Sequence, residues 1–383
     1  MADSFDYVVV GAGLAGAATA WRLAERGHQV AVVERSEPAN HEGSSHGSAR
    51  IFRFAYAETA YAALVKESLA GWKELGRLAR HSLITPTGCV DYGQVRKPRE
   101  LAEVLASVGV AHEVLSPEEA RSRWPQFAFD TVVLWHSGAG VIDAQETVHT
   151  MVRAAVGLGA RVYEDWALAA ARRSGAGYLL TNERGEELRA GRVVIAAGGW
   201  LPRLLGGLDL PSAFLASLPA FTVMQETAFH FPYREQPDPG TFWPAFIHKR
   251  HGIQTYGLPG RRDADYRGQK LAEFNGGRAI ADASAQDGLI DPAHRERIVE
   301  YVKQYVPGLL PEPYAETTCL FTNTPDEEFV IDSADGVTVL SPCSGHGAKF
   351  APLLGELAVD LATGAREVPL RFRPSLAGAG RQA

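Results

Sequence analysis

The fold of this chain is decided by the stretch from Tyr7 to Glu34, which reads YVVVGAGLAGAATAWRLAERGHQVAVVE. Its first residues, Tyr7–Val10, are apolar and β-branched and end at a glycine, which predicts a buried parallel strand. The alanine-rich segment Leu14–Arg26 is closed by Gly27, as expected of a helix. Residues 28–34 predict a second strand. We therefore predict a βαβ unit at the N-terminus.

A glycine motif lies between the first strand and the helix, and it reads Gly11-Ala12-Gly13-Leu14-Ala15-Gly16. The first glycine permits a tight turn, the second lets a pyrophosphate approach the backbone, and the third lets the helix pack on the strand. Glu34 follows Gly11 by 34 − 11 = 23 residues, where its carboxylate accepts both hydroxyls of an unphosphorylated ribose. The unit predicts a dinucleotide site, which this motif alone does not assign to FAD or to NAD.

Composition excludes several classes of protein. The 383 residues, 46% of them apolar, are enough for two domains. The formal charge of 38 − 45 = −7 argues against a nucleic-acid or anionic-membrane partner, because such binding needs a clustered excess of Lys and Arg. Three cysteines make no disulfide framework and suit a reducing compartment. The acidic N-terminus is unlike a secretory signal, so we expect a soluble, cytoplasmic protein without a membrane span.

One basic run interrupts this pattern without predicting a site. Lys249-Arg250 stands between His248 and His251, and we interpret the run as a solvated turn because most charged side chains are exposed. No cysteine or acidic cluster accompanies the two histidines, which a metal site would require. We therefore expect both histidines in a loop and no metal.

Further elements follow from periodicity and capping. Apolar residues recur at helical spacing from Tyr61, and Ser116 opens a capping box. Asp143 opens another helix, and residues 192–197 form a buried strand followed by glycines. The chain from about residue 375 is rich in Gly, Ala and Arg, and we expect it to be frayed.

The predicted fold class is α/β: a Rossmann-type dinucleotide-binding domain with an inserted α+β substrate domain. The inserted domain is expected to contain a mainly antiparallel sheet, because residues 211–318 are aromatic and punctuated by Pro and Gly. We assign residues 1–80, 140–210 and 319–383 to the first domain, and residues 81–139 and 211–318 to the second.

Three other stretches bear on the cofactor. They are residues 43–53 (GSSHGSARIFR), 319–326 (CLFTNTPD) and 344–350 (SGHGAKF). In this order they resemble the monomeric sarcosine oxidase and N-methyltryptophan oxidase family of flavoproteins, within the D-amino-acid-oxidase-like superfamily. The resemblance spans nearly the whole chain and includes residues 196–200 (AAGGW).

The resemblance implies FAD as the cofactor and gives roles to particular residues. Cys319 stands where the family cysteine is bonded to the flavin 8α-methyl carbon. Arg53 and Lys349 match the two cations that hold the substrate carboxylate. Lys270 matches the lysine placed over the flavin where oxygen reacts, and Tyr256 matches a pocket tyrosine. The expected cofactor-binding residues are Gly11, Gly13, Gly16, Glu34, Ser44, His46, Arg50, Gly198, Trp200, Cys319, Gly345, Gly347 and Lys349.

Physical arguments accompany these assignments. Arg53 follows Ile51-Phe52, and a buried guanidinium needs an anion. Lys349 lies in a Gly/Phe setting where an ammonium also needs a partner. Two cations in one cavity repel unless an anion lies between them, which predicts a carboxylate substrate; a structural ion pair with Asp or Glu is the competing interpretation. Without the motif, Cys319 would be a small buried hydrophobic residue and Lys270 a surface cation.

Two positions depart from the family pattern. Phe321 stands two residues after Cys319, where the sarcosine-type enzymes carry a tyrosine. The segment Glu273-Phe274-Asn275 falls where they place a pocket histidine. Both changes remove polar groups from the substrate side, so we expect a larger or more apolar N-substituted or cyclic amino acid.

The expected function is that of a flavin-dependent oxidase of a secondary (N-methyl or cyclic) amino acid. By the resemblance, a hydride passes from the substrate to FAD, the imine is hydrolysed, and O2 reoxidises the flavin to give H2O2. We expect a monomer. Three alternatives are a dehydrogenase that uses a partner acceptor, a non-catalytic flavin-binding module, and an NAD-dependent dehydrogenase.

Overall fold

The computed structural model describes residues 2–377. Most of the tail expected to be frayed lies outside this range. Within it, Pro374–Ala377 forms a short helix, α10, and the Ser375 N–H donates to Asp332 Oδ2 at 2.8 Å, so the beginning of that segment is ordered and the expectation is wrong there.

The first sheet is built around the predicted βαβ unit. β1 (Ser4–Val10) lies between β12 (Glu187–Ile195) and β2 (Val30–Val33), and both pairings are parallel. This eight-stranded sheet is completed by β9 (Arg161–Tyr163), β10 (Leu168–Ser174), β11 (Gly177–Asn182), β19 (Val330–Ala334) and β20 (Val337–Ser341). Where these parallel strands pair, residues 7–10 of β1, residues 193–195 of β12 and all of β2 are buried, as their unbroken apolar runs predict.

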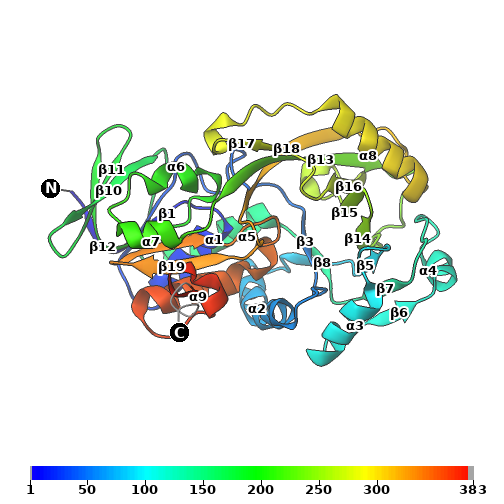
Figure 1. Cartoon of the computed structure of the whole chain (residues 1–383), viewed down its shortest axis with the longest axis horizontal. Helices are drawn as coiled ribbons and strands as arrows, with labels where there is room; N and C mark the ends of the chain where they lie inside the picture. The colour runs from blue at the N-terminus through cyan, green and yellow to red at the C-terminus, as the bar shows by residue number, and fades with distance from the viewer. Residues whose placement is uncertain (1, 378–383) are drawn as a thin grey trace.

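Helices cover one face of this sheet (Figure 1). α1 (Leu14–Glu25) packs between α9 (Ala351–Thr363) and α5 (Ala144–Gly157). Close contact needs a small residue at the α1–α9 crossing: a Cβ at Gly355 would lie 2.6 Å from the backbone of Ala18. The longer α2 (Thr59–Ala79) packs beside α9. The other face of the sheet is covered by α6 (Leu201–Leu205), α7 (Ser212–Ser217) and the chain around Trp166.

The second sheet is mainly antiparallel, as predicted. Its order is β17-β13-β16-β15-β14-β5-β7-β6, and β18 also pairs with β13. Only the β14–β5 pair in this sheet is parallel. The bounds are β5 (Cys89–Tyr92), β6 (Glu113–Leu115), β7 (Val133–His136), β13 (Thr222–Pro232), β14 (Ala245–Arg250), β15 (Ile253–Pro259), β16 (Gly268–Glu273), β17 (Arg278–Ile280) and β18 (Ala315–Asn323).

An aromatic core packs α8 (Pro292–Tyr305) against the outer face of the second sheet (Figure 1). The remaining elements are a small sheet and short helices: β3 (Arg50–Phe52), β4 (Ile84–Pro86), β8 (Gly140–Ile142), α3 (Pro98–Ser107), α4 (Pro117–Arg123) and 3-10 turns at Gly198–Trp200, Arg262–Ala264, Ala283–Ala285, Ala348–Phe350 and Leu370–Phe372. The predicted capping box is present, because Ser116 and Glu119 exchange both hydrogen bonds at the start of α4.

The predicted α/β class is confirmed, and the division of strands between the two large sheets supports the two-domain arrangement, which we retain as a proposal. The boundary expected at residue 319 falls inside β18, which belongs to the second sheet. Among the described residues, no helix is both long and apolar enough to cross a membrane.

One local expectation is wrong. His248, Lys249 and Arg250 are not a solvated turn or loop, because they form the end of β14. The turn follows at His251 and Gly252. His248 is fully buried, with Nδ1 2.8 Å from the Tyr301 hydroxyl. Lys249 and Arg250 are only partly exposed.

Candidate active site

A cavity of about 500 Å³ extends from the glycine motif to the inner face of the second sheet. Most residues singled out from the sequence line it: Gly11, Gly13, Glu34, Ser44, Arg50, Arg53, Gly198, Trp200, Tyr256, Lys270, Cys319, Gly345, Gly347 and Lys349. Gly16 and His46 do not reach its surface. Segments far apart in the chain therefore meet at one site.

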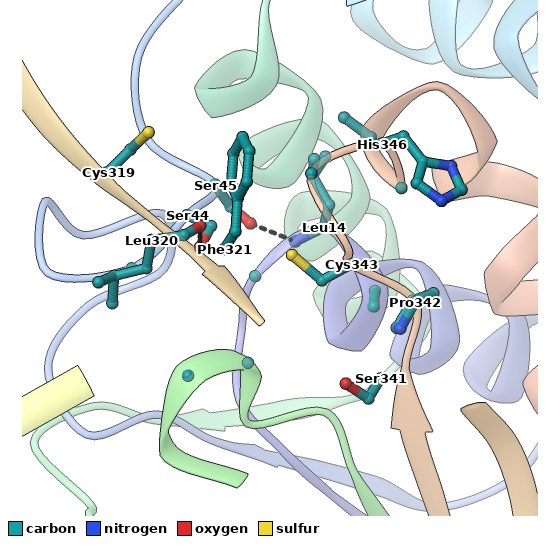
Figure 2. A pocket seen from close by; sticks show the side chains of 18 of the residues that line it. Leu14, Ser44, Ser45, Cys319, Leu320, Phe321, Ser341, Pro342, Cys343 and His346 are labelled. Carbon is teal, nitrogen blue, oxygen red and sulfur yellow. Dashed lines mark hydrogen bonds between the residues drawn. The ribbon is translucent and has the colours of Figure 1, made fainter. Parts of the chain in front are cut away.

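The glycine motif leaves backbone exposed at one end of the cavity. Gly11 has φ +98°, and a Cβ there would lie 2.5 Å from the carbonyl oxygen of Ala196. A Cβ at Gly16 would lie 1.8 Å from the Gly11 oxygen, so Gly16 is a packing residue between helix and strand. The N–H of Leu14 donates to Ser45 Oγ at 3.0 Å (Figure 2). This geometry suits a pyrophosphate at the α1 N-terminus.

Glu34 ends β2 beside this turn. Its Oε2 accepts from the Ala12 N–H at 2.7 Å, while Oε1 has only long contacts, 3.3 Å to Asn40 Nδ2 and 3.4 Å to the Ser36 N–H. Burial raises the pKa of Glu34, and the Ala12 N–H opposes that shift. The carboxylate retains acceptor capacity toward ribose hydroxyls, so the residues present fit the adenosine half of FAD.

β18 carries the candidate flavin attachment site. Cys319 and Phe321 project from the same side of this strand, whereas Leu320 projects from the other (Figure 2). The Leu320 carbonyl accepts from Ser44 Oγ at 2.6 Å, which ties the strand to the loop after β2. Burial raises the pKa of the Cys319 thiol, and the positive charge of Arg50 opposes this effect.

The neighbouring strands add polar groups to the same region. Lys270 on β16 is 6% exposed, and burial together with Arg50 lowers the pKa of its ammonium to about 8. Tyr256 on β15 is also close to Cys319, and burial raises the pKa of its hydroxyl, which is neutral at ordinary pH. Glu226 pairs with Cys319 across the β13–β18 ladder.

His46 occupies a different place from the one expected. It is buried within the loop between β2 and β3, with its ring 5.4 Å from that of His41, and it does not line the cavity. Arg50 does line it, and its guanidinium donates to the carbonyls of Ser44 and Ala49 at 3.0 and 2.9 Å. Arg50 thereby holds the shape of the loop that faces the cofactor end.

The opposite end of the cavity brings Arg53 and Lys349 together through Tyr56. The Arg53 guanidinium lies 4.6 Å from the Tyr56 ring centroid, and Lys349 Nζ donates to the Tyr56 hydroxyl at 3.0 Å. Lys349 Nζ also donates to the His346 carbonyl at 2.5 Å. Burial, reinforced by Arg53, holds the pKa of Lys349 well below its ordinary value. Lys349 is buried and Arg53 half-buried, and both contact Tyr56 at the same end of the cavity.

Hydrogen bonds orient this pair. His346 Nε2 faces the Glu327 carbonyl at 3.0 Å, and because a carbonyl only accepts, Nε2 carries a proton. Burial lowers the pKa of His346 to about 3, so the ring is neutral and Nδ1 is an acceptor. Tyr56 therefore donates to Nδ1 at 3.1 Å, and its oxygen accepts from Lys349. Nothing in the local sequence pattern around Tyr56 indicates this role.

Arg96 is a further cation at the site, and its place there was not predicted from the sequence. It lines the cavity and forms a 2.5 Å ion pair with Asp91, which is fully buried on β5. Arg96 Nη2 donates to the Ala55 carbonyl at 2.8 Å, and that carbonyl also accepts from Arg53. The two arginines are therefore held side by side by one backbone oxygen.

Asp91 also belongs to a cluster with Cys89 and His136. Within residues 2–377, these three side chains place possible metal-ligand atoms within 4.8 Å of one another. Arg96 occupies Oδ1 of the carboxylate, and its positive charge opposes a cation there. We therefore interpret the cluster as a structural group whose carboxylate fixes the Arg96 guanidinium, and not as a metal site.

Lys249 is the second cation at the site that the sequence pattern did not predict. It lines the cavity near the end of β14, with Nζ 5.5 Å from the ring centroid of Phe274. Phe274 lies 6.1 Å from Phe321, centroid to centroid. The two phenylalanines that depart from the family pattern thus form one wall, and the lysine lies over it.

Comparison with known proteins agrees with this architecture. A family model described as FAD dependent oxidoreductase matches residues 6–361. Monomeric sarcosine oxidase of Streptomyces avermitilis is 29% identical over 389 residues, 97% of either chain. N-methyl-L-tryptophan oxidase of Yersinia pestis is 26% identical, covering 92% of this chain and 94% of the relative. The structure of NikD, described as an unusual amino acid oxidase essential for nikkomycin biosynthesis, matches with TM-score 0.84 and 25% identity, covering 97% of this chain and 98% of that one.

The Arg96–Asp91 pair yields a stability prediction. Asp91→Asn removes the counterion of a buried guanidinium, and such losses cost about 3–5 kcal/mol. We expect the apparent melting temperature to fall by about 5 °C or more, measured by thermal unfolding of the holoprotein. The control is Glu113→Gln, which breaks the exposed Arg123–Glu113 pair and should shift the melting temperature by less than about 2 °C. Equal, small shifts in both variants would contradict the assigned role of Asp91.

Proposed function

The chain belongs to the family of FAD-dependent oxidoreductases, and from that premise we propose that it oxidises a secondary amino acid whose carboxylate binds between Arg53 and Lys349. The proposed substrates are N-methyl or cyclic amino acids, with O2 as the second substrate and H2O2 as a product. We also propose, from the sequence, that the protein is a cytoplasmic monomer.

The observation that carries this proposal is a pair of cations without an acidic partner, of which Lys349 is buried and Arg53 half-buried. Among residues 2–377, neither Arg53 nor Lys349 has a carboxylate within 4.0 Å. The competing interpretation, a structural ion pair, therefore lacks support. Buried charges require compensation, and a substrate carboxylate entering the cavity would supply it. A non-catalytic flavin-binding module gives no reason for two such cations.

The residues present fit FAD along the cavity. Gly11, Gly13 and Glu34 would hold the adenosine and pyrophosphate portions, and Cys319 would provide the proposed covalent bond to the flavin. When bound, FAD supplies the acceptor for a hydride from the substrate and passes the electrons to O2. The work left to the protein is binding, orientation and control of charge.

The side chains of the substrate end perform that work as follows. Arg53 and Lys349 hold the carboxylate, which places the amine toward Cys319 and Tyr256. Burial raises the pKa of Tyr56 to about 12, so its neutral hydroxyl relays hydrogen bonds without adding charge. An amine that binds as the free base needs no side chain to remove its proton, and the imine product is hydrolysed by water.

Lys270 would act at the oxygen side of the reaction. Its ammonium is buried and has no acidic partner within 4.0 Å among the described residues. A fixed cation stabilises the negative charge that O2 gains with its first electron. This role separates an oxidase from the alternative of a dehydrogenase with a partner acceptor.

The first prediction concerns the carboxylate. In anaerobic titrations of the holoenzyme, sarcosine, N-methylalanine and proline should be tested against dimethylamine, N-methylethylamine and pyrrolidine. We expect flavin bleaching only with members of the carboxylate-bearing group. Lys349→Met should weaken binding of the preferred amino acid by about tenfold or more, because a charge-assisted contact is lost. Equal reaction of amines with and without a carboxylate would overturn the proposal.

The second prediction concerns the flavin linkage. After acid precipitation of the purified protein, the yellow colour should stay with the pellet in the wild type and move to the supernatant in Cys319→Ala. Cys343→Ala is the matched control, because its thiol lines the same cavity, and it should keep the colour in the pellet. Yellow supernatant from the wild type would show bound but non-covalent flavin and remove Cys319 from this role.

The third prediction concerns Lys270. Since burial lowers the pKa of this ammonium to about 8, the rate at which O2 reoxidises the reduced holoenzyme should be highest below pH 8 and fall as pH rises through that value. Lys270→Met should slow reoxidation by about a hundredfold and abolish the pH dependence. Stopped-flow mixing with O2 measures both effects. Anaerobic reduction by substrate should change much less. A Lys270→Met enzyme that reoxidises normally would favour a partner acceptor.

A further inference from the structure

The substrate end of the cavity carries more positive charge than one carboxylate balances. Arg53, Arg96, Lys249 and Lys349 all line it. Asp91 pairs with Arg96. Of the other acidic residues that line the cavity near Tyr56, Glu58 and Glu328 pair with Arg371, and Asp326 and Glu327 are exposed. A substrate carboxylate between Arg53 and Lys349 still leaves the ammonium of Lys249 without an anion.

Backbone pairing places Lys249 beside the arginines. The parallel β14–β5 ladder brings β14 next to the strand that carries Asp91, and the Lys249 carbonyl accepts from the Val95 N–H at 3.0 Å. Arg96 is the next residue along the chain. These backbone contacts fix the position of residue 249 beside Arg96 at the cavity.

The Lys249 ammonium has apolar walls and cationic neighbours. It lies over the Phe274 ring, and among the described residues no carboxylate lies within 4.0 Å of it. Burial, Arg96 and Arg53 together lower the pKa of Lys249 to about 8, while Glu327 and Asp91 oppose them only weakly. A second anion in the cavity would relieve this repulsion and replace lost hydration.

We propose that the substrate is an amino dicarboxylate, whose second carboxylate binds Lys249 while the first binds Arg53 and Lys349. This inference rests on the proposed function and names its substrate class. It replaces the expectation of a more apolar substrate. Phe274 and Phe321 do remove polar groups, but they form the wall beneath a cation and strengthen its interaction with an anion by excluding water.

Pairs of substrates with the same shape, one an acid and one its amide, test whether the second carboxylate contributes to binding. The holoenzyme is reduced anaerobically by N-methylglutamate or N-methylglutamine, and by N-methylaspartate or N-methylasparagine. Each pair differs in one carboxylate against one amide. We expect the acid of at least one pair to react with at least about a tenfold higher kred/Kd than its amide, as for loss of one charge-assisted contact.

Variants of Lys249 test whether this residue causes the preference for the acid over the amide. Lys249→Met should reduce the acid-to-amide ratio to near one, and Lys249→Arg should retain most of it. Lys303→Met, an exposed lysine on α8 paired with Glu300, is the matched control and should leave the ratio unchanged. Calorimetry with two unreactive thioethers gives an independent readout: thiodiglycolate, with two carboxylates, should bind more tightly than methylthioacetate, with one, and only in proteins with a cation at residue 249.

The possible outcomes distinguish a failure of the dicarboxylate assignment from a failure of the proposed amine oxidation. Flavin reduction by N-methyl monocarboxylates with acid and amide reacting equally would overturn the dicarboxylate assignment and leave the amine oxidation standing. A preference for the acids that survives in Lys249→Met would overturn the role of Lys249. If no amino acid reduces the flavin and neither thioether binds, the proposed function itself fails.

Discussion

Four cationic side chains, Arg53, Arg96, Lys249 and Lys349, line the substrate end of the cavity. The surrounding structure must compensate their mutual repulsion. Asp91 neutralises Arg96 from a fully buried position. The Ala55 carbonyl accepts from both arginines. Lys349 donates to Tyr56, which donates in turn to a neutral His346. These contacts hold the cations in place and orient them. Of these four cations, only Arg96 has a carboxylate within 4.0 Å among the described residues. The remaining positive charge stays available to an anionic ligand.

The two large sheets divide the chemical tasks of the site. The first sheet and α1 present backbone and Glu34 to a dinucleotide, as parallel sheets do at the carboxyl ends of their strands. The second sheet presents Cys319, Lys270, Tyr256 and Lys249 from neighbouring strands. The loop after β2 joins the two, because Ser44 donates to the Leu320 carbonyl on β18. This contact sets the candidate attachment cysteine against the dinucleotide site, although the two are about three hundred residues apart in the chain.

At the substrate end, two phenylalanines stand where the family pattern has polar residues, and one lysine lies beside them. Phe321 and Phe274 indicated an apolar pocket when considered alone. In the structure they pack together on the sheet, and Lys249 lies over Phe274. Apolar neighbours make an ammonium more dependent on a counterion, so the same substitutions that remove hydrogen-bonding groups increase the demand for an anion. The exclusion of water by the phenylalanines and the positive charge of Lys249 therefore both favour binding of an anion.

Residue spacing along the chain is enough to predict the parts of this protein that form locally. The βαβ unit, the glycine turn, the acid at the end of β2 and the capped helices follow from residues close together in the chain, and so does the resemblance that pointed to FAD, Cys319, Arg53, Lys270 and Lys349. Tertiary structure alone decided which other side chains join them. Arg96 and Lys249 reach the cavity because β14 pairs with β5 and because one carbonyl binds two arginines. Tyr56 joins them through its contacts with Arg53, Lys349 and His346. Local patterns do not encode such pairings, and a lysine at the end of a strand has the same sequence appearance whether it faces solvent or a substrate.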